Sequence, residues 1–399
     1  MSICVANVDG PQVLERQLVA LNSAKVAVLF GGPSPEHDVS ILTGLQALRA
    51  LSDSSIHQCF GIYWSKQSEF YKIPVNLEGS DFAQAMESGR SVNGAELLKF
   101  EIGQGGGFKD AKSGFGKKSK SLEIDCVLNC CHGGPGEDGS IQGALDMSGI
   151  KYSGPNLTGA QLGMDKATFG ALIKSQGLPG LDRVVMTEDP KDVVFPGPYI
   201  LKPRFGGSSV GIDVVSDLAT AKSRMKVNLH LKQGAVIEPY RSDLFDLQIA
   251  VKSWPHVQLS AIERPIRSSG PGEILGYRDK YVGGQGMAGA PRELPAKIGE
   301  QLKKNICEAA MEVAQVAGIR GVARIDFLCS DNEEYYVNEV NTIPGSLSRY
   351  LFIDPPITFI DLLNDMIEEA MESPAVAFSA NGADGSALRS AGTISAKLA

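Results

Sequence analysis

The sequence contains no apolar run near the roughly 20 residues that a membrane-spanning helix requires, so we expect no transmembrane segment. It also lacks an excess of positive charge, because 38 Lys+Arg stand against 46 Asp+Glu and the formal net charge is −8. General nucleic-acid binding needs a basic face and is therefore excluded, although a local basic patch could bind a phosphorylated small molecule. The N-terminus has no basic segment followed by an apolar core, as a signal peptide would, and we expect a cytoplasmic protein.

Regularly spaced cysteines are also missing. The chain has seven cysteines, and no pair has the CxxC spacing of a zinc site. Most lie in apolar, strand-like runs, which predicts buried, reduced thiols. The 399 residues, 43% hydrophobic and 21% charged, are typical of a globular protein with two or three domains.

The first 160 residues alternate between apolar strand-like runs, glycine-rich turns and helical periodicity. This alternation predicts an open parallel α/β sheet. The expected strands are 25–30, 59–64 and 124–130, and the expected helices are 40–51, with Ser40 as a candidate N-cap, and 140–148. Residues 103–119 are rich in glycine and lysine and should form an exposed loop or a hairpin tip.

The second half predicts helices over 166–176 and 300–317 and two pairs of strands. The strands 198–203 and 210–215 flank a Gly-Gly-Ser-Ser turn, which indicates an antiparallel hairpin. The strands 323–329 and 334–341 flank a polar turn. The Ala/Ser/Gly-rich C-terminal residues show little periodicity and predict a disordered tail.

The strongest local pattern lies on this last pair of strands. Residues two apart on a strand share a face, so Arg324 lies beside Asp326, and Glu339 beside Asn341. Two carboxylates and an amide facing together suit Mg²⁺, which usually accompanies nucleotide phosphates. The alternative is a solvated sheet face, but the residues between are apolar and predict a buried opposite face: Ile325, Phe327, Tyr336 and Val340.

Three glycine-rich loops are further candidates. The loop KPRFGGSSVG (202–211) leaves backbone N–H groups free to bind phosphate beside Lys202, although it is not a Walker A motif and a plain hairpin turn is an equal alternative. HGGPGEDG (132–139) follows a buried strand, where α/β sheets bind ligands, which favours a functional His132 over a core histidine. GGPSPEHDVS (31–40) places Glu36 to meet a cation, or else only caps a helix.

Taken in order, six segments resemble the D-alanine–D-alanine ligase family of ATP-grasp enzymes: 31–40, 132–154, MDK (164–166), 202–211, DKY (279–281) and RIDF…NEVNTIPG (324–345). The resemblance implies an open, Rossmann-like α/β domain followed by two α+β ATP-grasp lobes that clasp ATP. The implied boundaries are an extension at 1–24, an N-terminal domain at 25–161, a central lobe at 162–238, a C-terminal lobe at 239–373 and a tail at 374–399.

The resemblance also implies a reaction. ATP phosphorylates the carboxylate of a first D-amino acid, and the amine of a second attacks the acylphosphate to give a dipeptide for peptidoglycan. The implied ligands are ATP, Mg²⁺ or Mn²⁺ and small amino acids, and the implied assembly is a homodimer. Two alternatives are a ligase with a different amino-acid or amine acceptor, and an inactive homologue that only binds nucleotide.

Site roles follow from the resemblance residue by residue. It implies metal ligation by Asp326, Glu339 and Asn341, phosphate binding by Lys166, Lys202 and Lys280, and adenine and ribose contacts by Glu238 and Asp246. For the first substrate it implies an ammonium pair with Glu36, supported by Ser208 and Tyr281, with His132 against the carboxylate. Arg324 and the Gly345 N–H would stabilise the oxyanion, and Lys280 would lie on a mobile loop, 273–290. Tyr281 favours an amine acceptor over a hydroxy acid.

The sequence departs from the family pattern where the second, acceptor substrate is expected to bind. A serine that holds the second carboxylate is expected where Tyr350 stands, so Ser348 or Arg349 could replace it. The ribose-binding segment 241–246 is also irregular, which leaves the place of Asp246 uncertain by about one position. The donor half therefore matches the family, while the acceptor half is altered.

Overall fold

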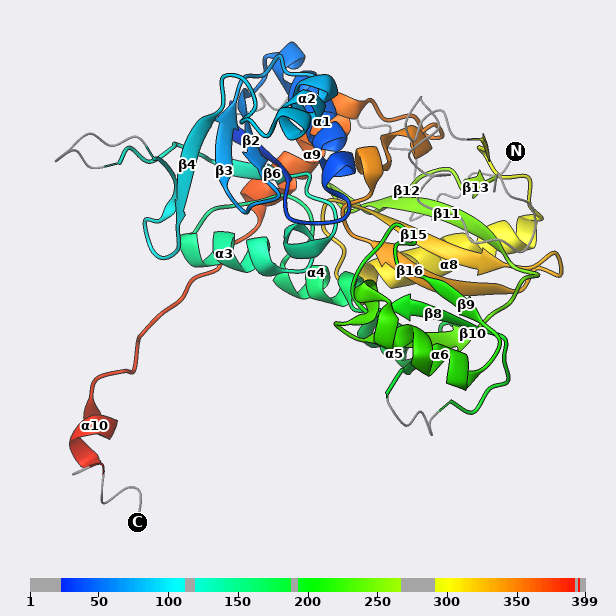
Figure 1. The fold of residues 1–399 in the computed structure, drawn as a ribbon. Helices are drawn as coiled ribbons and strands as arrows, with labels where there is room; N and C mark the ends of the chain where they lie inside the picture. The colour runs from blue at the N-terminus through cyan, green and yellow to red at the C-terminus, as the bar shows by residue number, and fades with distance from the viewer. Residues whose placement is uncertain (1–22, 112–118, 188–192, 267–290, 392–393, 395–399) are drawn as a thin grey trace.

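The structure is a computed structural model that describes residues 23–111, 119–187, 193–266, 291–391 and 394. Within these residues the chain forms one six-stranded sheet, two four-stranded sheets and one two-stranded sheet. Figure 1 shows the six-stranded sheet in one half of the molecule and the two four-stranded sheets stacked in the other. None of the helices in these ranges is both long and apolar enough to cross a membrane.

The six-stranded sheet has the order β5-β4-β3-β2-β1-β6. The predicted parallel pairing is present, because β1 pairs in parallel with both β2 and β6. The other three strands extend the sheet as an antiparallel meander that the sequence analysis did not predict, and β5 begins inside the segment expected to be a loop or hairpin tip. The strands are β1 (Lys25–Gly31), β2 (Gln58–Trp64), β3 (Phe70–Ile73), β4 (Glu96–Glu101), β5 (Gly107–Asp110) and β6 (Cys126–Asn129).

Three α-helices and one short 3₁₀ helix belong to this domain: α1 (His37–Ser54), α2 (Gly79–Ser88), η1 (Gly134–Gly136) and α3 (Ser140–Ser148). Helix α1 begins three residues before Ser40, so the predicted N-cap role is wrong. The Ser40 hydroxyl instead accepts from the Gly31 N–H at 2.7 Å and donates to the Cys130 carbonyl at 2.8 Å. It thereby ties α1 to the ends of two parallel strands, from which the glycine-rich loops emerge.

The central sheet has the order β7-β10-β8-β9, and β8 and β9 form the predicted antiparallel hairpin. Asn156 caps α4 and Asp165 caps α5, because each side chain accepts backbone N–H groups of the first turn. The elements are α4 (Leu157–Met164), α5 (Lys166–Ser175), β7 (Val184–Val185), β8 (Tyr199–Pro203), β9 (Asp213–Val215), α6 (Leu218–Val227), η2 (Leu229–Leu231) and β10 (Ala235–Pro239).

The third sheet has the order β12-β11-β15-β16, and helix α8 packs on one of its faces (Figure 1). A register shift at Asp326/Phe327 places Val337 in the core instead of Tyr336, which corrects the predicted buried face at that position. The elements are β11 (Phe245–Lys252), β12 (Gln258–Leu259), β13 (Arg264–Pro265), β14 (Arg292–Glu293), α8 (Glu300–Val316), β15 (Val322–Cys329) and β16 (Tyr335–Asn341).

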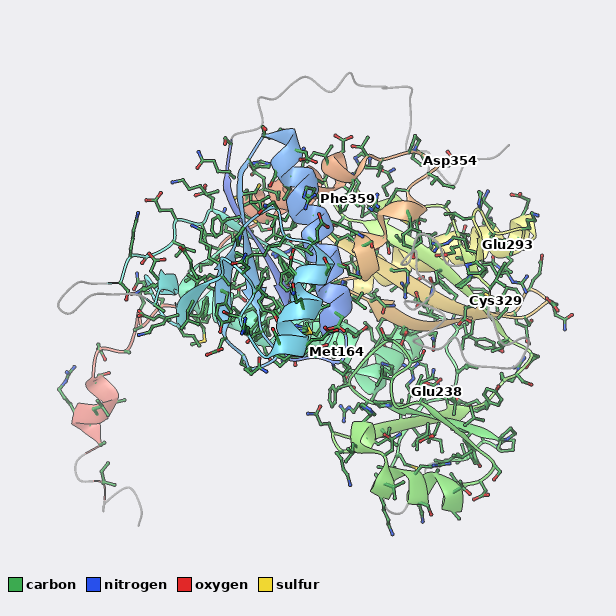
Figure 2. The ribbon with its side chains drawn as sticks, turned by 45° about the horizontal axis from the view of Figure 1, so that its top comes forward. Met164, Glu238, Glu293, Cys329, Asp354 and Phe359 are labelled. Carbon is green, nitrogen blue, oxygen red and sulfur yellow. The ribbon has the colours of Figure 1, made fainter. Side chains whose placement is uncertain are left out.

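The last ordered elements return to the first domain. η4 (Gly345–Leu351) and α9 (Phe359–Glu372) share a hydrophobic core with α1, and Figure 2 labels Phe359, where α9 begins. Each large sheet lies within one of the predicted units, except that β10 ends one residue past the expected boundary, and the boundaries themselves stay predictions. The described tail residues lead away from the body in Figure 1 and contain only the short helix α10 (Ser386–Ser390), which buries no residue.

The cysteines match the predicted role of core residues. Of the six in the described ranges, five are buried and Cys59 is half-buried, and all six are free thiols. Burial raises the pKa of Cys126, Cys130 and Cys329 to about 12.

Candidate active site

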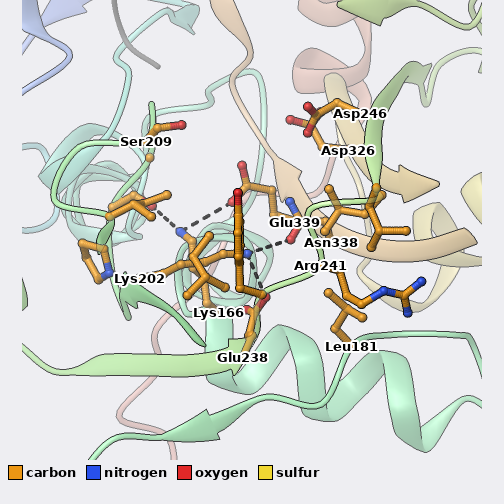
Figure 3. A pocket seen from close by; sticks show the side chains of 18 of the residues that line it. Lys166, Leu181, Lys202, Ser209, Glu238, Arg241, Asp246, Asp326, Asn338 and Glu339 are labelled. Carbon is orange, nitrogen blue, oxygen red and sulfur yellow. Dashed lines mark hydrogen bonds and ion pairs between the residues drawn. The ribbon is translucent and has the colours of Figure 1, made fainter. Parts of the chain in front are cut away.

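A pocket lies between the central sheet and the third sheet, and its charged lining comes from both (Figure 3). Lys202 and Glu238 enter from β8 and β10, while Asp326 and Glu339 enter from β15 and β16. Asp246, on β11, lies beside Asp326 in Figure 3. With Lys166, the pocket therefore contains six of the side chains proposed to bind the nucleotide or the metal.

Glu238 is fully buried and carries two cationic partners. Its carboxylate accepts from Arg183 Nε at 2.6 Å and from Lys202 Nζ at 2.8 Å. Burial alone would raise the pKa of Glu238, but Arg183 and Lys202 outweigh it and lower the pKa, so the group is ionised. Lys202 also donates to the Asn338 side-chain oxygen at 3.1 Å, which holds it beside Glu238. Sequence reasoning missed both residues, since Arg183 lies in none of the six family segments and Asn338, the first residue of NEVNTIPG, was given no role.

Lys166 lies between this pocket and a second cavity and lines both. Its ammonium group donates to the Gly206 carbonyl and lies 3.6 Å from the Glu339 carboxylate. Burial lowers the pKa of Lys166, and the nearby Glu339 opposes that shift. A buried cation shared by two cavities is suited to bind a group that passes from one to the other.

The predicted metal ligands are brought together. Asp326 pairs with Glu339 across β15 and β16, and Arg324 pairs with Asn341, as the alternation along the strands predicted. Arg324 donates to Asp326 at 2.6 and 2.8 Å, so the predicted metal ligand and the predicted oxyanion donor form an ion pair. The Asn341 amide nitrogen is buried and has no hydrogen-bond partner among the described residues. Carboxylate and amide oxygens fit Mg²⁺, but no group of three or more His, Cys, Asp or Glu in the described ranges suits a metal.

The second cavity lies against the N-terminal domain and contains the residues predicted for the first substrate. Glu36, His132 and Ser208 line it, together with Arg324 and Gly345. The Ser208 hydroxyl donates to Glu36, which joins the N-terminal domain to the glycine-rich loop of the central lobe. A Cβ at Gly207 would lie 3.1 Å from a Glu36 carboxylate oxygen, so a side chain there would press against Glu36. The cavity thus presents a half-buried carboxylate suited to an ammonium group.

His132 is held on both sides of its ring. Nδ1 donates to the Ile343 carbonyl at 2.6 Å, and Nε2 lies 2.8 Å from the Thr43 hydroxyl. Burial lowers the pKa of His132, so the ring is neutral near pH 7. Neighbouring Glu137, which sequence reasoning did not single out, accepts from the N–H groups of Gly133 and Ile343, both at 2.9 Å. These bonds attach the loop before Gly345 to the N-terminal domain.

The three candidates for the acceptor end lie outside the walls of this cavity. Ser348 is fully buried, and its hydroxyl has no hydrogen-bond partner in the described chain. Arg349 is exposed and its guanidinium lies over the ring of Phe359 at 5.1 Å, which turns it away from Glu36. The ring of Tyr350 packs under Arg292, beside Glu263. Lys280, Tyr281 and the loop predicted to close the site lie outside the described residues.

A pocket between two antiparallel sheets, which shares Lys166 and Glu339 with a second cavity against the N-terminal domain, is typical of the ATP-grasp class of enzymes. Comparison of the chain with known protein families identifies the family within this class. Family models described as D-ala D-ala ligase N-terminus and C-terminus match residues 25–155 and 160–368. The chain belongs to the D-alanine–D-alanine ligase family, whose members are ATP-dependent ligases.

Individual relatives agree with this assignment. A D-alanine–D-alanine ligase from Campylobacter jejuni subsp. doylei is 31% identical over 352 residues, covering 87% of this chain and 94% of that protein. One from Thermosipho africanus is 30% identical over 358 residues, covering 87% and 93%. A solved D-alanine–D-alanine ligase from Coxiella burnetii has the same fold, with a TM-score of 0.70 at 21% identity over 88% of this chain and 94% of that one.

Proposed function

We propose that this protein uses ATP and Mg²⁺ to join D-alanine to D-alanine, producing a dipeptide for peptidoglycan precursors. The observation that supports this most is the wall shared by the two cavities, since Lys166, Gly206, Gly207 and Glu339 line both. A phosphoryl group on a nucleotide in one cavity can therefore meet a carboxylate in the other without leaving the protein.

In the first step, a carboxylate oxygen of the first D-alanine attacks the γ-phosphorus of ATP, the bond to the bridging oxygen breaks and ADP leaves. Glu36 binds the ammonium group of that D-alanine and is oriented by Ser208. Lys166 lies between the cavities and neutralises charge on the transferred phosphoryl group. Lys202 and Lys280 are proposed to bind phosphates, although Lys202 here donates to Glu238 and Asn338.

In the second step, the amine of the second amino acid loses a proton and attacks the acyl carbon, and the carbon–oxygen bond to phosphate breaks. Arg324 and the Gly345 N–H line the cavity where negative charge develops on the acyl oxygen. Asp326, Glu339 and Asn341 would hold Mg²⁺, which neutralises phosphate charge when bound. Glu238 and Asp246 are proposed for adenine and ribose, and His132 for the donor carboxylate.

The test is ADP release with ATP, Mg²⁺ and D-alanine, with mass spectrometry of the product. We expect D-alanyl-D-alanine and an equal amount of ADP, and none with L-alanine alone. If purified, folded protein forms neither product with any D-amino acid, the proposal is wrong and the inactive nucleotide-binding homologue takes its place. The homodimer implied by the resemblance stays a prediction that light scattering would test.

A second candidate keeps the first step and changes the acceptor. It is favoured by Tyr350, whose half-buried ring under Arg292 replaces the small serine expected there. Turnover with D-alanine that requires a different amino acid or amine as second substrate would decide for this candidate.

A further inference from the structure

Thr43 lies in the middle of α1 and touches two loops that are far apart in the sequence. Its hydroxyl is buried, 2.8 Å from His132 Nε2, and it accepts from the Ser346 N–H at 3.0 Å. Neither the family motifs nor the proposed site residues include this threonine.

The hydrogen bonds around Thr43 leave one consistent arrangement of protons. The Ile343 carbonyl can only accept, so His132 Nδ1 carries the ring proton and Nε2 carries a lone pair. The Thr43 hydroxyl must then donate to Nε2, while its own oxygen accepts from Ser346. The Ile343 carbonyl thus sets the tautomer of His132, while Thr43 holds the other side of the ring by donating to Nε2 and links that ring to the turn after Gly345.

That turn has an unfavourable backbone. Ser346, Leu347 and Ser348 have φ of 50°, 50° and 49°, three successive left-handed residues, none of them glycine. Residues other than glycine adopt the left-handed conformation only at a cost in free energy, so other contacts must hold the turn. Leu347 is fully buried in the core shared with α1, and its N–H donates to the Pro344 carbonyl at 2.8 Å. The bond from Ser346 to Thr43 is the polar contact that ties the turn to the helix.

We propose that Thr43 is a positioning residue, which holds the ring of His132 through Nε2 and holds the turn that carries the Gly345 N–H. This inference rests on the proposed function. Because α1 begins directly after Glu36, one rigid helix places both the carboxylate for the donor ammonium and the anchor of the oxyanion turn. Loss of the Thr43 hydroxyl should therefore impair attack by the second amine more than phosphorylation of the first carboxylate.

The experiment compares Thr43→Val, which keeps the shape and loses the hydroxyl, with Thr43→Ser, which keeps the hydroxyl. Rapid-quench measurement of the first turnover separates the ADP burst from dipeptide formation. We expect Thr43→Val to keep the burst and to slow dipeptide formation by about 10–100-fold, the loss of one buried hydrogen-bonding group, and Thr43→Ser to stay within about threefold of wild type. Thr220→Val is the matched control, because Thr220 lies in α6, outside the cavities.

A second readout does not need turnover. The ¹⁵N shift of His132 Nε2, assigned with a His132→Gln variant, should indicate a hydrogen-bonded nitrogen in wild type and Thr43→Ser, and a nitrogen without that bond in Thr43→Val, with Nδ1 protonated in all three. Equal Nε2 shifts in all three proteins would overturn the inference, and so would a rate loss in Thr43→Val that is equal for both steps and is accompanied by a lower melting temperature. If wild type makes no product but the Nε2 shift changes as expected, the proposed function fails while the role of Thr43 stands.

Discussion

The guanidinium of Arg292 lies over the ring of Tyr350, with Cζ 4.4 Å from the ring centroid, and the same guanidinium pairs with Glu263 at 2.9 Å. Both charged groups are buried, and the Tyr350 hydroxyl is buried with no hydrogen-bond partner in the described ranges. Nearby Arg324 and Asp326 act electrostatically on Tyr350. Thus the residue that departs from the family pattern is part of a packed, charge-balanced cluster next to the proposed oxyanion donor.

We expect Tyr350→Ser to change the choice of the second substrate. Removal of the ring opens buried space beside Arg324 and frees Arg292 from its stacking partner, so larger acceptors should gain at least about tenfold in kcat/KM relative to D-alanine. The measurement is competition between acceptors followed by mass spectrometry. Tyr199→Ser removes a buried tyrosine from β8, away from this cluster, and should leave the preference unchanged. The same preference in Tyr350→Ser as in wild type would exclude a role in acceptor choice.

Asp326→Asn should impair turnover more than folding. The amide has nearly the same shape but lacks the charge that binds a hard cation and that pairs with Arg324, so kcat should fall by about 100-fold or more. Asp331→Asn, in the exposed turn between β15 and β16, is the control. Steady-state kinetics across Mg²⁺ concentrations, with thermal melting of each variant, measures both effects. A kcat equal to that of wild type would rule out metal ligation by Asp326.

The sequence predicted those parts of the site in which a short motif lies on a strand, because the alternation of side chains then shows which of them share a face. The twofold alternation predicted that Asp326 and Glu339 face together on two paired strands, and in the structure the two residues lie directly opposite each other. The bulge was not predictable, because a single extra residue leaves no mark in the hydrophobic pattern. It turns both Asn338 and Glu339 toward the pocket, which explains why Asn338 was missed.

Contacts between residues far apart in the sequence could not be predicted either. Arg183 meets Glu238 across 55 positions, and Thr43 meets Ser346 across 303, so nothing local in the sequence indicates either contact. The antiparallel strands β3–β5 were missed for a different reason. Two of them have only four residues, too few for alternation to stand out from the surrounding turns.

Arg183→Met should destabilise the folded protein. It removes one of two cations from a fully buried carboxylate and also breaks the bonds from Arg183 to the Lys166 and Asn338 carbonyls. The free energy of unfolding should fall by about 3 kcal/mol, because a buried charge loses its partner. Arg49→Met, which breaks the exposed pair with Glu78, should cost no more than about 1 kcal/mol. Urea titration of both variants tests this, and equal losses would show that the Glu238 cluster adds nothing beyond a surface pair.

Glu137 should give the stability of the protein a distinct pH dependence. Burial, with a smaller effect of Glu36, raises the pKa of Glu137 to about 7 from an ordinary value of 4.5. Between these values the folded protein keeps a proton that the unfolded chain has lost, so the contribution of Glu137 to stability is fully present below pH 4.5 and is lost as the pH rises to 7. That loss amounts to about 3 kcal/mol. Urea titrations from pH 4.5 to 8 should therefore show a flatter curve for Glu137→Gln than for wild type, and no such flattening for the exposed Glu308→Gln. Parallel curves for wild type and Glu137→Gln would mean that Glu137 is ionised throughout this range, stabilised by the N–H groups of Gly133 and Ile343.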